Sequence, residues 1–75
     1  MKENKTITST FFTFQYSEEN IPQIQYTVEV EILAVGNELP KIGGYAVIDE
    51  TNHYTILDLD KETLEDAYQV WLDTQ

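Results

Sequence analysis

Carboxylates are the side chains in this chain with the greatest capacity for chemistry. Fourteen Asp and Glu stand against four Lys, with no Arg, one His and no Cys in 75 residues. The nearest approach to a metal-binding motif is the segment 58–62 (DLDKE), whose acids match the first, third and fifth positions of an EF-hand loop. That loop needs Gly at its sixth position and Glu at its twelfth, where this chain has Thr63 and Gln69. We therefore expect no metal site and interpret these acids as the end of a strand followed by the start of a helix.

Two pairs of acids have a spacing that general acid–base catalysis could use. Asp49 and Asp58 would face each other across a hairpin, and Glu29 and Glu31 lie two residues apart. Catalysis of this kind needs two carboxyls in a cleft, with pKa values separated by different surroundings. All four acids fall at strand positions that face water, and the single histidine, His53, has no Ser or Cys nucleophile motif beside it. The sequence therefore predicts a protein that is not an enzyme and has no catalytic residues.

Two further features could bind a ligand, and both lack the partners that such a site needs. A phosphate-binding loop requires a following helix start, a lysine and further glycines, which Gly43-Gly44 does not have. Nine aromatic side chains could stack on bases, but no basic groove accompanies them, and the net charge of −10 repels nucleic acid and anionic membranes. We expect no cofactor, no direct nucleic-acid binding and no membrane association, with most aromatic residues in the core.

The acids themselves are the strongest candidate for a binding surface. Six acids and one lysine fall between Asp58 and Asp73. Two more acids form a second row on the wet face of a strand, about 6.7 Å apart because they are separated by two strand residues. Such rows are similar to the phosphates of nucleic acid in sign and in coarse spacing, whereas the alternative is a surface that is acidic only for solubility. The candidate partner-binding residues are Glu29, Glu31, Asp58, Asp60, Glu62, Glu65, Asp66 and Asp73.

Four runs of residues predict strands and one predicts a helix. β-branched and aromatic residues fill 6–16, and five apolar residues alternate strictly with polar ones at the start of 23–35. The segments 45–50 and 53–59 are shorter strand candidates, and apolar residues recur at i, i+3, i+4, i+7 and i+8 over the helix 61–73. Short connections favour antiparallel pairing. The sequence predicts one small α+β domain over residues 1–75: an antiparallel three- to four-stranded sheet with one C-terminal helix packed on one face.

The same patterns place several features within these elements. We expect a turn at 17–20, a loop at 36–44 and a helix N-cap at Asp60. Trp71 is expected to be mostly buried against the strand 23–35, near Tyr26, Val28 or Val30. The predicted inward stripe of the helix comprises Leu64, Ala67, Tyr68, Trp71 and Leu72.

Charge and size together are similar to those of small acidic α+β proteins encoded by phages and mobile elements. These include nucleic-acid mimics that block nucleases, glycosylases, CRISPR effectors or transcription machinery. The likeness is one of composition and transfers no residues. It implies a non-enzymatic inhibitor that occludes the basic, nucleic-acid-binding site of a partner protein, with association driven by electrostatic steering.

A second hypothesis assigns the acids to solubility alone and makes the protein a small homo-oligomeric structural or accessory protein. The strand 6–16 contains no acid and is the natural edge for pairing with a second copy, which would give a homodimer. On either hypothesis we expect a cytoplasmic protein. The N-terminus shows no apolar targeting segment, and the longest apolar run, Ile32–Val35, is too short to span a bilayer.

Overall fold

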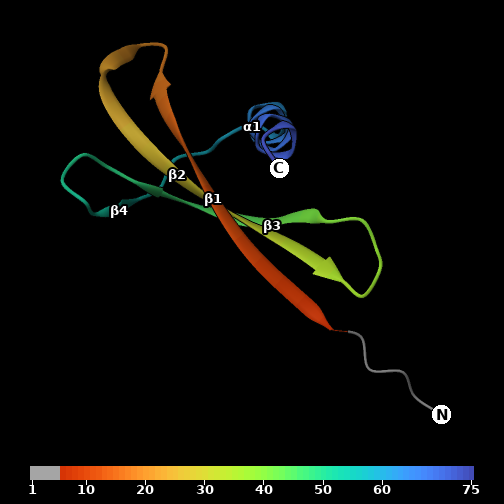
Figure 1. The fold of residues 1–75 in the computed structure, drawn as a ribbon. Helices are drawn as coiled ribbons and strands as arrows, with labels where there is room; N and C mark the ends of the chain where they lie inside the picture. Colours follow the sequence, from red (N-terminus) through yellow and green to blue (C-terminus); the bar gives the residue numbers. More distant parts are fainter. Residues whose placement is uncertain (1–5) are drawn as a thin grey trace.

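Each strand of the fold pairs with its neighbour in the sequence. The computed structural model describes residues 6–75. Its elements are β1 (Ile7–Glu18), β2 (Ile21–Val35), β3 (Lys41–Ile48), β4 (Tyr54–Thr55) and α1 (Lys61–Asp73). The strands form one antiparallel sheet in the order β1-β2-β3-β4, and α1 lies on one of its faces (Figure 1). The predicted α+β fold with a single helix is confirmed.

The β1–β2 hairpin is longer than the sequence pattern predicts, because the turn between its strands is shorter. Pairing runs without interruption from Ile7 opposite Val35 to Tyr16 opposite Tyr26, and resumes with Glu18 opposite Ile21 after an irregularity. The polar segment 17–20, predicted as a turn, is therefore divided between a strand end and a two-residue connection. Backbone pairing resumes at Glu18 although the apolar alternation has ended at Tyr16, so the extent of the hairpin is set by strand pairing and not by the side-chain pattern.

β3 begins at Lys41, four residues earlier than predicted, and the loop expected over 36–44 ends at Pro40. The reason is a β-bulge. Glu31 pairs with Gly44, whereas the next residue of β2, Ile32, pairs with Ile42, which leaves Gly43 as an extra residue. A Cβ on Gly43 would lie 2.7 Å from Leu33 Cδ1, so this position has no room for a side chain unless Leu33 moves.

β4 is only two residues long, although the sequence predicts a strand over 53–59. After Thr55 the chain leaves the sheet, and one side chain replaces the missing strand pairing. The Tyr45 hydroxyl donates a hydrogen bond to the Leu57 carbonyl at 3.1 Å and accepts one from the Leu59 N–H at 3.0 Å. The segment is thus held beside β3 while it turns toward α1.

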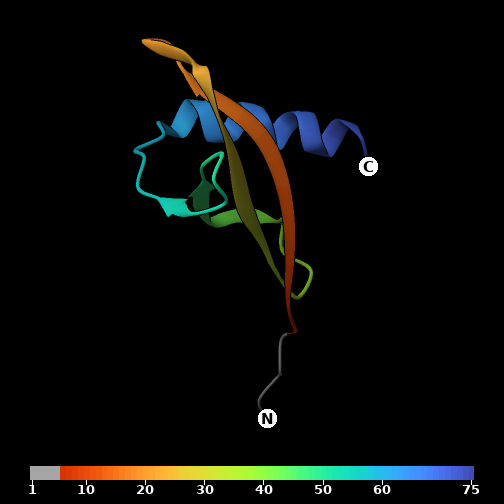
Figure 2. The ribbon, with the colours of Figure 1, turned by 90° about the vertical axis from the view of Figure 1, so that its left-hand side faces the viewer.

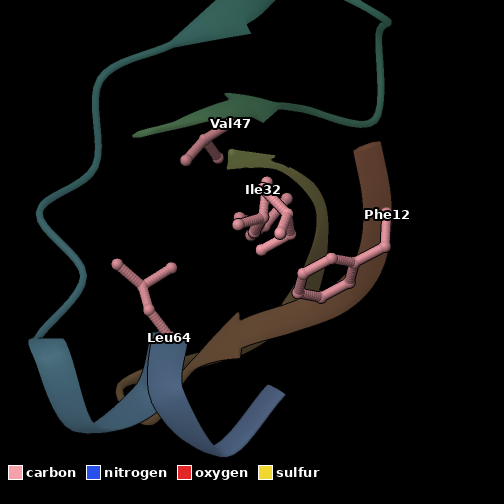
Figure 3. Packing of buried hydrophobic residues seen from close by; sticks show 6 residues of the cluster. Phe12, Ile32, Val47 and Leu64 are labelled. Carbon is pink, nitrogen blue, oxygen red and sulfur yellow. The ribbon is translucent and has the colours of Figure 1, made fainter. Parts of the chain in front are cut away.

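The core lies between the sheet and α1 (Figure 3). Its buried apolar residues are Phe12, Val28, Val30, Ile32, Val47 and Leu64. Trp71 is half-buried rather than mostly buried; its ring stacks on Phe12 of β1 with centroids 5.2 Å apart, and it packs against the core cluster that includes Val28 and Val30 of β2. Leu72, predicted to point inward, is 37% exposed. The cause is visible in Figure 2, where α1 crosses the sheet and its C-terminal end continues past β1.

Candidate partner-binding surface

Four of the eight candidate acids lie on the solvent-exposed side of α1. Glu62, Glu65, Asp66 and Asp73 are all exposed, as the helical periodicity predicts. The nearest cation is Lys61, whose Nζ lies 3.9 Å from a Glu65 carboxylate oxygen. Both of these side chains are more than half exposed, so water screens the pair and it neutralises little of the acidic surface.

Asp60 begins the helix and uses its carboxylate to do so. Its side chain accepts a hydrogen bond from the Thr63 N–H at 3.0 Å, which confirms the predicted N-cap. Hydrogen bonds from the side chain and the backbone of Thr63 lower the pKa of Asp60. Asp58, two residues earlier, is exposed. These two acids therefore extend the acidic surface of α1 at its N-terminal end, although one oxygen of Asp60 is already engaged.

Glu29 and Glu31 do not join this surface. They alternate along β2 with Val28 and Val30, which are fully buried beneath α1. Because successive strand residues point to opposite faces, both acids project from the face of the sheet that α1 leaves open. Glu31 also accepts a hydrogen bond from the Ser9 hydroxyl at 2.7 Å. The eight acids consequently form two groups on opposite sides of the sheet: the α1 acids (Asp58, Asp60, Glu62, Glu65, Asp66 and Asp73) and the open-face pair (Glu29 and Glu31).

Asp49 and His53, two of the residues considered for acid–base chemistry, build a turn; Asp58 does not face Asp49, because β4 ends at Thr55 and the Asp49 N–H donates to the His53 carbonyl. Asp49 accepts hydrogen bonds from the Thr51 N–H, the Thr51 hydroxyl and the His53 N–H, at 3.0, 2.7 and 3.0 Å. The His53 N–H contributes most to lowering the pKa of Asp49, followed by the Thr51 hydroxyl. Asn52, with φ of 68°, supplies the left-handed residue that reverses the chain. The Asp49 carboxylate is thus engaged within the turn, and the Thr51 hydroxyl also lies 2.8 Å from His53 Nδ1. Within residues 6–75, no three His, Asp or Glu side chains gather in a way that could hold a metal ion.

A groove between β1 and α1 is the feature that sequence reasoning missed. It has a volume of about 560 Å³, and Asp66 is its single charged lining residue among those described. One wall is the stretch of β1 from Phe12 to Tyr16, and the other includes Trp71 and Val70 of the helix. Val70 is 65% exposed and falls outside the predicted inward stripe, so an apolar residue off the stripe was the available signal.

Comparison of the chain with protein-family models, with curated proteins and with solved structures finds no match. The α1 helix is too short and too polar to cross a membrane, and it is the single helix among the described residues.

Proposed function

We propose that this protein is a non-enzymatic acidic binding protein that occludes a basic site on a partner protein, of the kind that otherwise binds nucleic acid. The observation that carries the proposal is the group of α1 acids. They are exposed on α1 and in the segment just before it, and Lys61, whose Nζ lies 3.9 Å from a Glu65 carboxylate oxygen, is itself exposed and neutralises little of their charge. This is the function of the small acidic inhibitors of phages and mobile elements that the composition resembles.

Electrostatics supports a basic partner over a neutral one. The chain has a net charge of −10 and no arginine, so its field attracts cationic surfaces and repels anionic ones. Acids one turn apart on a helix, such as Glu62 and Glu65, have Cβ atoms about 5–6 Å apart. A partner that presents Lys and Arg along a groove could contact several of these carboxylates at once, and steering would speed the encounter.

The arrangement narrows the proposed surface to one side of the molecule. Since the sheet separates the open-face pair from the α1 acids, a partner with a single flat site cannot contact both groups. We assign binding to the α1 side because six of the eight acids lie there, four within α1 and two, Asp58 and Asp60, just before its first residue. The open-face pair then becomes an internal control.

Two double variants with equal charge separate specific binding from a general effect of acidity. In Glu65→Lys/Asp73→Lys and in Glu29→Lys/Glu31→Lys, two acids become two lysines, so the net charge changes by four units, from −10 to −6. Host proteins retained on DNA-cellulose are challenged with the original chain at low salt, and each protein released is purified for titration calorimetry. We expect the α1 variant to bind at least tenfold more weakly, the open-face variant to bind nearly as well, and affinity to fall steeply with salt.

Three results would contradict the proposal. One is that the original chain releases no protein from DNA. Another is that both variants lose affinity equally, which would make net charge alone responsible. The third is that neither variant loses affinity, which would leave the acids a role in solubility only. Circular dichroism of both variants checks that they remain folded.

A further inference from the structure

We propose that β1 pairs with β1 of a second copy of this chain, antiparallel and about a twofold axis, so that two four-stranded sheets become one of eight strands. β1 is at the edge of the sheet in the described part of the chain, with β2 on its other side. The inference goes beyond the proposed function, because it concerns the backbone edge of β1, which carries none of the eight candidate acids; Asp66 of α1 lines the groove beside that edge.

The edge of β1 lacks the devices that keep edge strands apart. Such strands are usually short, bulged, or marked by proline or charge, since an open row of N–H and C=O groups can pair with another chain. β1 is 12 residues long, and from Ile7 to Ser17 it contains no charged residue and no proline. Its pairing with β2 is regular as far as Tyr16. A long edge that is regularly paired on its other side and carries no charge is one that can accept another strand.

The groove beside β1 fits a strand with the pattern of β1 itself. A strand added to this edge would lay alternate side chains beneath the overhanging end of α1, against Val70 and Trp71. Apolar side chains are needed there, and polar ones on the open face. Over residues 12–16 β1 has this arrangement, with Phe12, Phe14 and Tyr16 on the α1 side and with Thr13 and Gln15 opposite, whereas Phe11 just before this stretch is an exposed apolar residue on the open face. The partner strand that the groove requires is therefore present in the chain.

Charge explains why the pairing uses this edge. Two copies at net charge −10 repel each other, so they can approach best where acids are absent. Asp66 is the one acid among the residues that line the groove, while Glu62, Glu65 and Asp73 lie outside it. Antiparallel pairing about a twofold axis perpendicular to the sheet keeps both helices on the same face. The dimer would thus present two sets of α1 acids side by side, although its formation does not depend on any acidic partner.

Single cysteines test the pairing, because the chain has no cysteine of its own. Exposed β1 residues are replaced one at a time in Thr8→Cys, Thr10→Cys, Thr13→Cys and Gln15→Cys, with Asn37→Cys in an exposed loop as the control. In antiparallel pairing, the same residue in the two copies lies closest together at the twofold axis. For each residue further along the strand from that axis, the distance between the two copies of the residue grows by about 6.7 Å, or two strand rises. We expect disulfide-linked dimers to form efficiently at one β1 position and to decline on either side of it.

Sedimentation of the original chain from about 5 to about 500 μM accompanies the cross-linking. We expect a concentration-dependent dimer. A monomer throughout that range would overturn the proposal, as would a dimer whose cysteines cross-link best at Asn37→Cys or at none of the β1 positions. Equal cross-linking at all four β1 positions would indicate parallel pairing and would overturn the twofold arrangement.

Discussion

The two faces of the sheet are made from the same strands, yet one face carries buried apolar side chains and the other carries mostly polar or exposed ones. β2 supplies both: Val28 and Val30 have no exposed surface, whereas Glu29 and Glu31 alternate with them on the other side. On the covered face, Trp71 stacks on Phe12, and Tyr68 stacks on Trp71 with ring centroids 5.9 Å apart. The open face instead carries Phe11 at 57% exposure and a hydrogen bond between Ser9 and Glu31.

This difference indicates where the stability of the domain resides. Burial of apolar surface is the main favourable term in folding, and here it is concentrated between β2 and α1. The open face contributes strand pairing and a few polar contacts but little burial. Substitutions on the covered face should therefore cost much more than comparable ones on the open face.

The largest expected effect is that of Trp71→Ala on the covered face. The variant removes a half-buried ring that joins α1 to β1, and we expect it to lower the free energy of unfolding by about 2–4 kcal/mol. Urea unfolding followed by circular dichroism measures the change. Val70→Ala, one residue earlier and 65% exposed, is the control and should change stability by less than about 0.5 kcal/mol. Equal losses in the two variants would show that α1 does not pack through Trp71.

Gly43→Ala tests a close contact at the β-bulge, between Gly43 of β3 and Leu33 of β2. The new Cβ would lie 2.7 Å from Leu33 Cδ1 and 2.9 Å from Leu33 Cγ, so we expect a loss of about 1–2 kcal/mol as Leu33 is displaced. Gly44→Ala is the matched control, because nothing lies within 4 Å of the position that its new methyl group would take, and the change should be neutral or slightly stabilising. If the two alanines behave alike in urea unfolding, the bulge is not constrained by Leu33.

Asp60 should make the attachment of α1 to the covered face dependent on pH. Hydrogen bonds lower the pKa of Asp60 in the folded chain, below its value of about 3.9 in the unfolded chain. Its contribution to stability is therefore complete above about pH 4 and is lost as the pH falls through the folded-state pKa. Asp60→Asn keeps an acceptor without a charge to titrate. The melting temperature of the original chain should fall relative to that of Asp60→Asn between about pH 4 and pH 2.

Thermal melts followed by circular dichroism at pH 7 and pH 3 give this comparison. Relief of repulsion among the other acids is common to both proteins and cancels in the difference. Asp60→Ala removes the acceptor and should melt earlier than both at pH 7. If the difference in melting temperature between the original chain and Asp60→Asn stays constant with pH, the ionised carboxylate stabilises the helix N-terminus no more than a neutral side-chain acceptor does.

The smallest effect is expected for Phe11→Thr on the open face. With 57% of its side chain exposed, Phe11 should contribute less than about 0.5 kcal/mol to the stability of the isolated chain, and Thr retains a strong preference for strands. Urea unfolding at about 1 μM protein measures this value. A loss of unfolding free energy comparable to that of Trp71→Ala would contradict the difference between the two faces, because it would mean that another surface covers the open face in solution.

The features that were predictable from the sequence are those set by a single periodicity. Alternation identified the strand that contains Val28 and Val30, and the helical repeat located α1 to the residue. The bulge at Gly43 was not predictable, because it depends on which residue of β2 lies opposite. The shortness of β4 depends on the Tyr45 hydroxyl, whose partners Leu57 and Leu59 are set by tertiary structure.

The candidate site was predictable only in part for the same reason. Helical spacing correctly predicted that Glu62, Glu65 and Asp73 are exposed, and the residue type of Asp60 correctly predicted the helix N-cap. Whether the acids of β2 would join them depended on which face of the sheet α1 covers. The groove beside β1 required the angle at which α1 crosses the sheet, which no local pattern specifies.

The order of the strands also determines the order in which the chain can fold. Every strand pairs with the one before it, so the β1–β2 hairpin and then β3 can form from contacts close in sequence, a topology associated with rapid folding. α1 follows all four strands and therefore leaves the ribosome after the sheet. Until it docks, Phe12, Val28, Val30 and Ile32 form an uncovered apolar surface beside an unprotected edge. The interval between completion of the sheet and arrival of the helix is thus the period in which this protein is most prone to aggregate during synthesis.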